Sequence, residues 1–196
     1  AFVEIQSQNE CAARLDDTTT SILSHYLCGL SARPLRVKTA TTACTDTETV
    51  YLPAFINQFE DPEENAILYR LTATQLWAQI HFGTFRRESA RAPTLSQVLD
   101  HYEDPVRARE LFQLLEQIRL EACIRRAFPG LARQMDRLRT ASSVTIEKTR
   151  TVAGPLLTPN ATVQDTLALL EDLYEDNPRL PPPPPWAGEI DIARAE

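Results

Sequence analysis

The stretch of sequence that decides the fold is residues 61–83, DPEENAILYRLTATQLWAQIHFG. At its start, Asp61 can accept hydrogen bonds from free backbone N–H groups, and Pro62 suits the first helical position because it lacks an N–H donor. The two glutamates that follow place negative charge at the positive end of a helix dipole. Apolar side chains then recur at steps of three and four: Tyr69, Ala73, Leu76, Trp77 and Ile80. The stretch therefore predicts one long helix that ends at about Gly83.

The pair Asp104-Pro105 repeats this start and predicts a second long helix, which the run Phe128-Pro129-Gly130 brings to an end. Its apolar residues trace one face: Leu111, Phe112, Leu115, Ile118, Ala122 and Cys123. More than half of the circumference of this helix is apolar, so we expect it at the centre of a bundle.

Shorter stretches complete the helical pattern. A first helix is predicted over residues 10–30, and Gly29 and Pro34 bring it to an end. Its predicted inner face consists of Leu15, Ile22, Leu23, Tyr26, Leu27 and Leu30. Further helices are predicted over residues 94–102, 131–150 and 161–175.

Residues 35–52 have a different character, because β-branched residues and a tyrosine favour extended chain there. The sequence Thr45-Asp46-Thr47 is typical of a turn between two short strands. A hairpin of this size is not stable alone, so it must lie against the helices. The predicted fold class is therefore mainly α: a helical bundle with a small β-hairpin near residues 35–52.

The helical pattern ends after Tyr174, and proline then dominates the sequence. Residues 181–185 are consecutive prolines, which favour an extended polyproline II strut. We expect a helical domain over residues 1–175 and a Pro-rich linker over residues 176–196 toward a further domain outside this chain. A ligand for an SH3-type or WW-type domain is the alternative interpretation of the proline run.

Composition narrows the classes of protein. The net charge of -7 argues against a general nucleic-acid or anionic-membrane partner, and no apolar run approaches the ~18 residues that span a membrane. The four cysteines, at positions 11, 28, 44 and 123, form no CxxC pair and are expected to be reduced and mostly buried. We expect a cytoplasmic interaction domain, and because it begins with Ala rather than Met, a fragment of a longer protein.

Motifs of nucleotide-binding and hydrolytic enzymes are missing from the sequence, which has neither a Gly-rich phosphate loop nor a GxSxG pattern. The histidines, His25, His81 and His101, stand far apart and favour structural or solvent-facing roles. Glu116 and Arg119 lie three residues apart on a largely apolar helix, and we predict an internal ion pair between them. No catalytic residue, metal ligand or cofactor is predicted, and the chain is not expected to be an enzyme.

Four stretches, in order, resemble motifs of one known family. Residues 45–53, TDTETVYLP, resemble TDG-x-x-[IV]-x-LP, and residues 64–70, ENAILYR, are similar to an E-x-N-x-x-x-Y-[KR] element. Residues 73–85 resemble a helix that ends in FGTF, and residues 111–131 resemble an F-x-x-x-E-x-x-R…YPGL helix. Over residues 45–138 the chain thus resembles the N-terminal helical region of the CbbO/NorD family, whose members carry a C-terminal von Willebrand factor A domain.

Some members of that family carry a zincin-like H-E-x-x-H in the middle helix, where histidines one turn apart can hold Zn²⁺. The matching positions here are Gln75, Leu76 and Gln79, and His81 stands where a third, acidic ligand would be. One histidine and two neutral amides make a poor zinc site, so we expect both glutamines to be hydrogen-bonding core residues.

The resemblance implies a non-catalytic adaptor that works with a MoxR-type AAA+ ATPase ring, CbbQ-like or NorQ-like, to activate a target enzyme. The sequence of residues 77–79 and the Pro-rich C-terminal segment favour the CbbO branch, whose target is Rubisco. The NorD branch, tied to nitric oxide reductase, is the alternative. In either branch the missing A domain would grip the target. Two other classes stay open: a zincin-like metal hydrolase, and a free-standing helical scaffold with no ATPase partner.

Charged clusters are the candidate contacts with such a ring. Acidic surfaces at residues 60–64 and 171–176 could steer the chain toward a basic rim. Two arginine pairs could instead steer the chain toward an acidic surface. We predict these four as partner-binding residues: Arg86, Arg87, Arg125 and Arg126.

Overall fold

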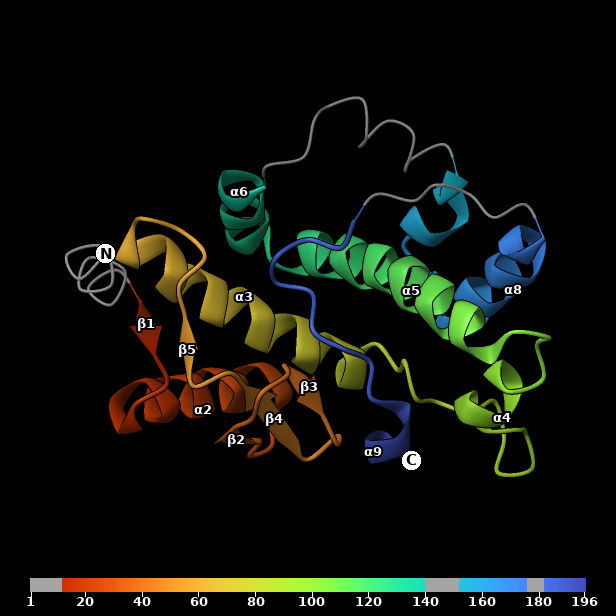
Figure 1. Cartoon of the computed structure of the whole chain (residues 1–196), viewed down its shortest axis with the longest axis horizontal. Helices are drawn as coiled ribbons and strands as arrows, with labels where there is room; N and C mark the ends of the chain where they lie inside the picture. Colours follow the sequence, from red (N-terminus) through yellow and green to blue (C-terminus); the bar gives the residue numbers. More distant parts are fainter. Residues whose placement is uncertain (1–11, 140–151, 176–181) are drawn as a thin grey trace, which may run out of the picture.

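The computed structural model describes residues 12–139, 152–175 and 182–196, which form a mainly α-helical fold with small strands, as predicted (Figure 1). Two long helices, α3 (Pro62–His81) and α5 (Pro105–Ala127), run through the middle of the molecule. The small sheets pack against α3, whereas most of the shorter helices pack against α5. This arrangement leaves two hydrophobic cores, one around each long helix.

Helix α3 begins as the sequence predicts. The side chain of Asp61 accepts a hydrogen bond from the backbone N–H of Glu63 at 2.8 Å, and Pro62 occupies the first turn. The helix ends at His81, and Gly83 then adopts a φ of 73°, a left-handed conformation that lets the chain leave the helix axis. Buried residues lie all around α3, because it packs against the strands and against three other helices.

Helix α2 (Asp17–Ser31) starts later than the helix predicted over residues 10–30. Asp16 caps it by accepting a backbone hydrogen bond at 2.7 Å. Just before this cap, strand β1 (Ala13–Arg14) pairs antiparallel with β5 (Phe55–Ile56). The prediction was therefore wrong for this part, and its first two residues lie outside the described residues.

The predicted end and inner face of the first helix also need correction. Gly29 lies within α2, and the chain turns instead at Ala32, which adopts a left-handed φ of 53°. Leu23 and Leu27 are buried as expected, but Ile22 is 62% exposed.

The predicted hairpin is present. Strands β3 (Cys44–Thr45) and β4 (Thr49–Leu52) pair antiparallel, and Asp46 in the turn accepts hydrogen bonds from two backbone N–H groups and from the hydroxyl of Tyr51. A third strand, β2 (Arg36–Thr39), pairs parallel with β4 and makes the hairpin part of a three-stranded sheet. The sequence favours extended chain at β2 but does not indicate its partner.

Helix α5 lies between the two cores, as expected for a central helix. Asp104 caps its start by accepting from two backbone N–H groups at 3.0 and 3.1 Å. Leu120 and Ile124, in its C-terminal half, pack in the core around α3. Leu115 packs in the second core with α8 (Val163–Tyr174).

The shorter helices lie where the sequence predicts them: α4 (Leu95–Leu99), α6 (Pro129–Leu138) and α8. The second of these ends earlier than the predicted residue 150, because the chain becomes extended at Arg139; residues 140–151 lie outside the described residues. A 3₁₀ helix, η1 (Gly154–Leu157), was not predicted and packs against α5 and α8.

The C-terminal segment, residues 182–196, runs between α3 and α5 and ends in the short helix α9 (Ile192–Ala195), as Figure 1 shows. Trp186 is fully buried in the core around α3, and the guanidinium of Arg139 lies 5.4 Å from its ring centroid. Ile190 is buried in the second core. The segment therefore contributes to both cores.

Backbone contacts also hold the C-terminal segment. The N–H of Glu189 donates to the carbonyl of Ala43 at 2.8 Å, and Gly188 packs so closely on Leu76 that a Cβ would lie 2.4 Å from it. The described part of residues 176–196 is thus packed against the helices, which differs from the extended spacer that its prolines suggested. Residues 176–181 lie outside the described residues.

Candidate functional site

Partly buried hydrogen bonds of Tyr69 and Asn65 join residues 64–70 of α3 to the chain over residues 53–59. The hydroxyl of Tyr69 donates to the carbonyl of Pro53 at 2.8 Å. Asn65, one turn earlier on α3, accepts from the backbone N–H groups of Gln58 and Phe59 at 2.9 and 3.0 Å and donates to the carbonyl of Phe59 at 2.7 Å. Burial raises the pKa of Tyr69 to about 12, so its hydroxyl keeps its proton and remains a donor at neutral pH.

The predicted ion pair between Glu116 and Arg119 is present and joins the last two stretches. Nε of Arg119 donates to Oε2 of Glu116 at 2.8 Å, and neither side chain is more than 1% exposed. The hydroxyls of Thr84 and Thr166 donate to the same carboxylate at 2.6 and 2.7 Å. Arg119 also donates to the carbonyl of Phe82, at the end of α3.

Both side chains of this ion pair form further hydrogen bonds. Arg119 makes a further hydrogen bond to the carbonyl of Ala161 at 3.2 Å. Burial by itself lowers the pKa of its guanidinium, but the hydrogen bonds and the charge of Glu116 outweigh burial, so the pKa of Arg119 is raised and it stays charged. A buried pair whose groups are all occupied suits a structural role rather than a reactive one.

The α3 positions that would match zinc ligands carry no such set. Gln75 and Gln79 are 1% and 0% exposed, and Leu76 between them is fully buried. His81 lies at the surface and stacks on the ring of Trp77, with 4.5 Å between ring centroids. Among the described residues, no group of three or more His, Cys, Asp or Glu side chains could hold a metal ion.

Two glutamines bind the backbone of the C-terminal segment. Nε2 of Gln117 donates to the carbonyl of Gly188 at 2.9 Å, and Nε2 of Gln79 donates to the carbonyl of Glu189 at 3.4 Å. The expectation of a hydrogen-bonding core residue is therefore confirmed for Gln79 but not for Gln75, whose buried Oε1 has no partner among the described residues. The partner of Gln79 lies far away in the sequence, so nothing local indicated it.

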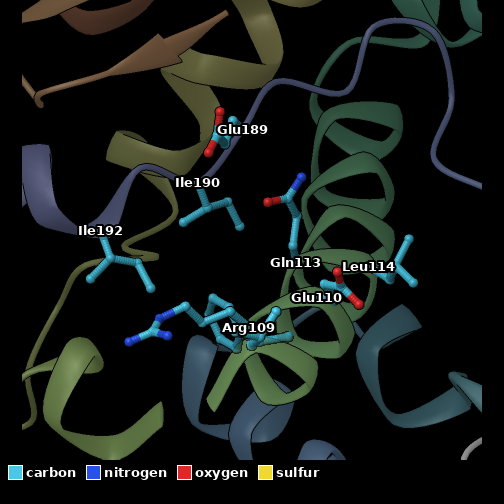
Figure 2. Close-up of a pocket in the computed structure, with 9 residues that line it drawn as sticks. Arg109, Glu110, Gln113, Leu114, Glu189, Ile190 and Ile192 are labelled. Carbon is cyan, nitrogen blue, oxygen red and sulfur yellow. The ribbon is translucent and has the colours of Figure 1, made fainter. Parts of the chain in front are cut away.

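A groove of about 460 Å³ separates the start of α5 from the C-terminal segment (Figure 2). Ile190 and Ile192 form one wall, and Arg109 and Gln113 of α5 lie opposite. Arg109 is ion-paired with Asp100. The groove also contains acidic side chains, so it favours neither an anionic nor a cationic ligand.

The second predicted arginine pair is engaged within the chain. Arg125 forms ion pairs with Glu121 and Asp136, each at 2.7 Å. Arg126 donates to the carbonyl of Leu157 at 3.0 Å. These contacts differ from a free cationic patch, and the partner-binding role of the pair stays a prediction.

The first arginine pair lies on an exposed loop between α3 and α4. We call residues 86–91 the arginine loop, because all six are exposed and three of them are Arg86, Arg87 and Arg91. Among the described residues these arginines make no ion pair, and Glu88 is the one acidic residue in the loop. The loop is therefore a local cationic surface on an acidic chain.

A second groove, of about 700 Å³, lies beside α6, and we call it the Arg70 groove. Its lining includes Tyr26 of α2, Arg70 of α3, Phe128 between α5 and α6, and Arg133 of α6. Arg70 is the basic residue that ends the second family-like stretch. Sequence reasoning missed this site because its walls come from three separate helices; a basic residue within an otherwise buried helix was the available signal.

The described cysteines are free thiols. Cys44 and Cys123 are buried, as expected, whereas Cys28 is exposed; Cys11 lies outside the described residues. Burial raises the pKa of Cys44, against an opposing effect of the nearby Arg194 charge. The Cys44 thiol therefore lacks the lowered pKa that marks a reactive cysteine.

No helix in the described ranges combines the length and apolar character that crossing a bilayer requires. Comparison of the chain with family models, curated proteins and solved structures finds no match. Residues of the four stretches quoted above make the hydrogen bonds between Tyr69 and Pro53 and between Thr84 and Glu116.

Proposed function

We propose that this chain is a non-catalytic, cytoplasmic adaptor domain that works with a MoxR-type AAA+ ATPase ring, CbbQ-like or NorQ-like, to activate a target enzyme. Rubisco is the proposed target, and nitric oxide reductase, as in the NorD branch, is the alternative. Contact with the ring is assigned to this chain, and contact with the target to an A-type domain outside it.

The observation that supports this proposal is that side chains of the four stretches that resemble the family form hydrogen bonds within the fold. Tyr69 binds Pro53, and Thr84 binds Glu116, so the side chains that carry the resemblance hold distant stretches together. Side chains bound in this way are not available to a substrate. The amides of Gln75 and Gln79 at the buried α3 positions favour the same reading over a zincin-like hydrolase.

The arginine loop is the surface that best fits a ring contact. The chain as a whole has a net charge of -7, whereas residues 86–91 carry three arginines and one glutamate. A local patch of opposite sign orients a protein as it approaches a partner and raises the association rate at low salt. An acidic rim on the ATPase would therefore meet this loop first.

The test is co-elution of the whole chain with purified CbbQ-like and NorQ-like ATPases, together with their rate of ATP hydrolysis. We expect co-elution and a changed rate with the CbbQ-like ring. The double variant Arg86→Glu/Arg87→Glu should lose both. A matched control, Arg14→Glu/Lys38→Glu, makes the same change in charge at two exposed positions outside the loop and should keep both.

Each other outcome has a definite meaning. Clean separation and unchanged hydrolysis with both ATPases would contradict the adaptor function. Co-elution with the NorQ-like ring alone would favour the NorD branch. Binding that survives the loop reversal would place the docking surface elsewhere on the chain.

A further inference from the structure

The Arg70 groove contains an arginine whose charge has no anionic partner among the described residues. Nη2 of Arg70 donates to the neutral amide oxygen of Gln134 at 2.9 Å. Its Nε is buried and makes no hydrogen bond to any described atom. No carboxylate of the described residues lies within ion-pair distance of Arg70. Taking a guanidinium out of water without a charged partner is unfavourable, so the site is electrostatically incomplete.

The other charges around the groove do not complete it. Arg137 is bound by Asp61 and Glu64, each at 3.2 Å, and these carboxylates are therefore already engaged. Asp136, three residues after Arg133 on α6, is already paired with Arg125 at 2.7 Å. The charges left over in the groove are thus both positive.

The rim supplies a second cation and a phenol. Arg133 is exposed and makes no ion pair with a described residue. The hydroxyl of Tyr26 is hydrogen-bonded to Thr74 at 2.8 Å, and burial raises the pKa of Tyr26 against the effects of Thr74 and of Arg70, so the phenol adds no negative charge. Of the residues that the structure describes, no acidic side chain lines the groove.

Apolar groups lie beside these cations. Phe128 and Leu131 line the groove and are each partly buried against the first core, which leaves part of their surface in the groove. A ligand that fits would therefore present carboxylates to the two arginines and an apolar side chain between them. That combination is typical of a protein segment and not of a simple inorganic anion.

We propose that the Arg70 groove binds an acidic segment of a partner protein, with one carboxylate on Arg70, a second on Arg133 and an apolar side chain on Phe128 and Leu131. Beyond the bond from Nη2 to Gln134, the guanidinium of Arg70 can donate charge-assisted hydrogen bonds to a carboxylate that enters the groove. This interaction does not depend on the proposed ATPase partner and can be tested without it.

The test is titration of the ¹⁵N-labelled whole chain with the peptide acetyl-LEELEE-amide, followed by NMR. We expect shifts of the Gly130 and Leu131 amides and of others in α6. Arg70→Gln and Arg133→Gln should each weaken binding about tenfold or more, as expected for loss of a charge-assisted hydrogen bond. Arg70→Lys, which keeps the charge but not the fork, should weaken it less. Arg91→Gln, which removes an equally positive exposed side chain outside the groove, should leave it unchanged.

Three results would overturn the proposal. The neutral peptide acetyl-LQQLQQ-amide could bind as tightly, which would remove the role of the carboxylates. Inorganic phosphate or free glutamate could give the same shifts at the same concentration, which would reduce the site to a general anion contact. Binding could also survive both substitutions. Since Arg133 is exposed, Arg133→Gln keeps the test decisive even if Arg70→Gln does not fold.

Discussion

Arg119 donates to both carboxylate oxygens of Glu116, three residues earlier on α5, at a site where neither side chain is more than 1% exposed. Two threonine hydroxyls also donate hydrogen bonds to the carboxylate, and the guanidinium donates to two backbone carbonyls. These groups come from α5, from α8 and the residues just before it, and from the segment that follows α3. The pair lies on α5 between Leu115 of the second core and Leu120 of the first, and it links α5 to α8 and to the segment after α3.

The stabilities lost on substituting Glu116 and Arg119 one at a time should add up to more than the stability lost when both are substituted together. Glu116→Gln leaves the buried charge of Arg119 unpaired, and we expect the free energy of unfolding to fall by about 3–5 kcal/mol. Arg119→Gln should have a similar effect. The double variant, with no charge left, should be less destabilised than the two single losses added together, by ~1–3 kcal/mol. Urea unfolding of the four proteins measures this coupling, and strictly additive losses would show that the charges act independently.

Replacing Thr47 with glycine should make the protein more stable. Thr47 has a φ of 72°, which costs a β-branched residue roughly 1–2 kcal/mol, and the motif it resembles has Gly at this position. Its contacts in the turn use backbone atoms: its N–H with Thr45 and its carbonyl with Arg33. Because glycine also gains freedom when unfolded, we expect Thr47→Gly to raise the free energy of unfolding by only ~0.5–1 kcal/mol.

The control for this change is Thr41→Gly, at an exposed position of the same region without a positive φ. There the substitution only adds freedom to the unfolded chain, so it should lower stability by up to ~1 kcal/mol. Thermal unfolding of both variants compares them directly. Equal losses would mean that the turn is not strained at Thr47.

Helix starts and the hairpin could be predicted because their signals are local. Asp61 and Asp104 cap helices through residues that follow them at once, and Asp46 closes its turn in the same way. The pairing of β2 with β4 and of β1 with β5 could not be predicted, since short strands choose partners by tertiary packing. The packing of the C-terminal segment could not be predicted for the same reason. Its prolines favour an extended spacer locally, whereas Trp186 is buried in the core by tertiary packing.

The candidate sites show the same limit. Arg86-Arg87 and Arg125-Arg126 are indistinguishable as dipeptides in the sequence. The structure separates them, because Arg125 forms ion pairs with Asp136 and Glu121, whereas the arginines of the arginine loop form none with a described residue. The ion pair of Glu116 and Arg119 could be predicted because both members lie on one helix face.

Gly188 should not tolerate a side chain. A Cβ there would lie 2.4 Å from Cδ2 of Leu76, which is fully buried, and 3.2 Å from the carbonyl oxygen of Ala43. Since neither neighbour can move freely, Gly188→Ala should displace the C-terminal segment and lower the free energy of unfolding by about 1–3 kcal/mol. Gly29→Ala is the matched control: it lies within α2 with nothing within 4 Å of an added Cβ, and should stabilise by ~0.5–1 kcal/mol. Urea unfolding that ranks the two variants equally would show that the segment is loosely held.

Tyr69 should make the protein sensitive to alkaline pH. Its pKa is raised by burial to about 12, whereas an unfolded tyrosine titrates near ~10. Below the lower value the phenol is protonated in both states and its contribution to stability is complete. As the pH rises between the two values, the unfolded chain loses this proton first, so the free energy of unfolding should fall by up to ~1.4 kcal/mol per pH unit.

The variant Tyr69→Phe separates this effect from general alkaline unfolding. It cannot titrate at this position, and it leaves the carbonyl of Pro53 without its donor, so it should be less stable than the wild type by ~1–3 kcal/mol near neutral pH. Above pH ~10 its stability should fall less steeply, and the two curves should converge. Tyr26 and Tyr102 also have pKa values raised by burial and are present in both proteins, so the difference between the curves reports Tyr69 alone. Urea unfolding across this pH range, with tyrosinate absorbance recorded in parallel, measures both quantities. Parallel curves would show that the Tyr69 hydroxyl loses its proton as readily in the folded protein as in the unfolded chain.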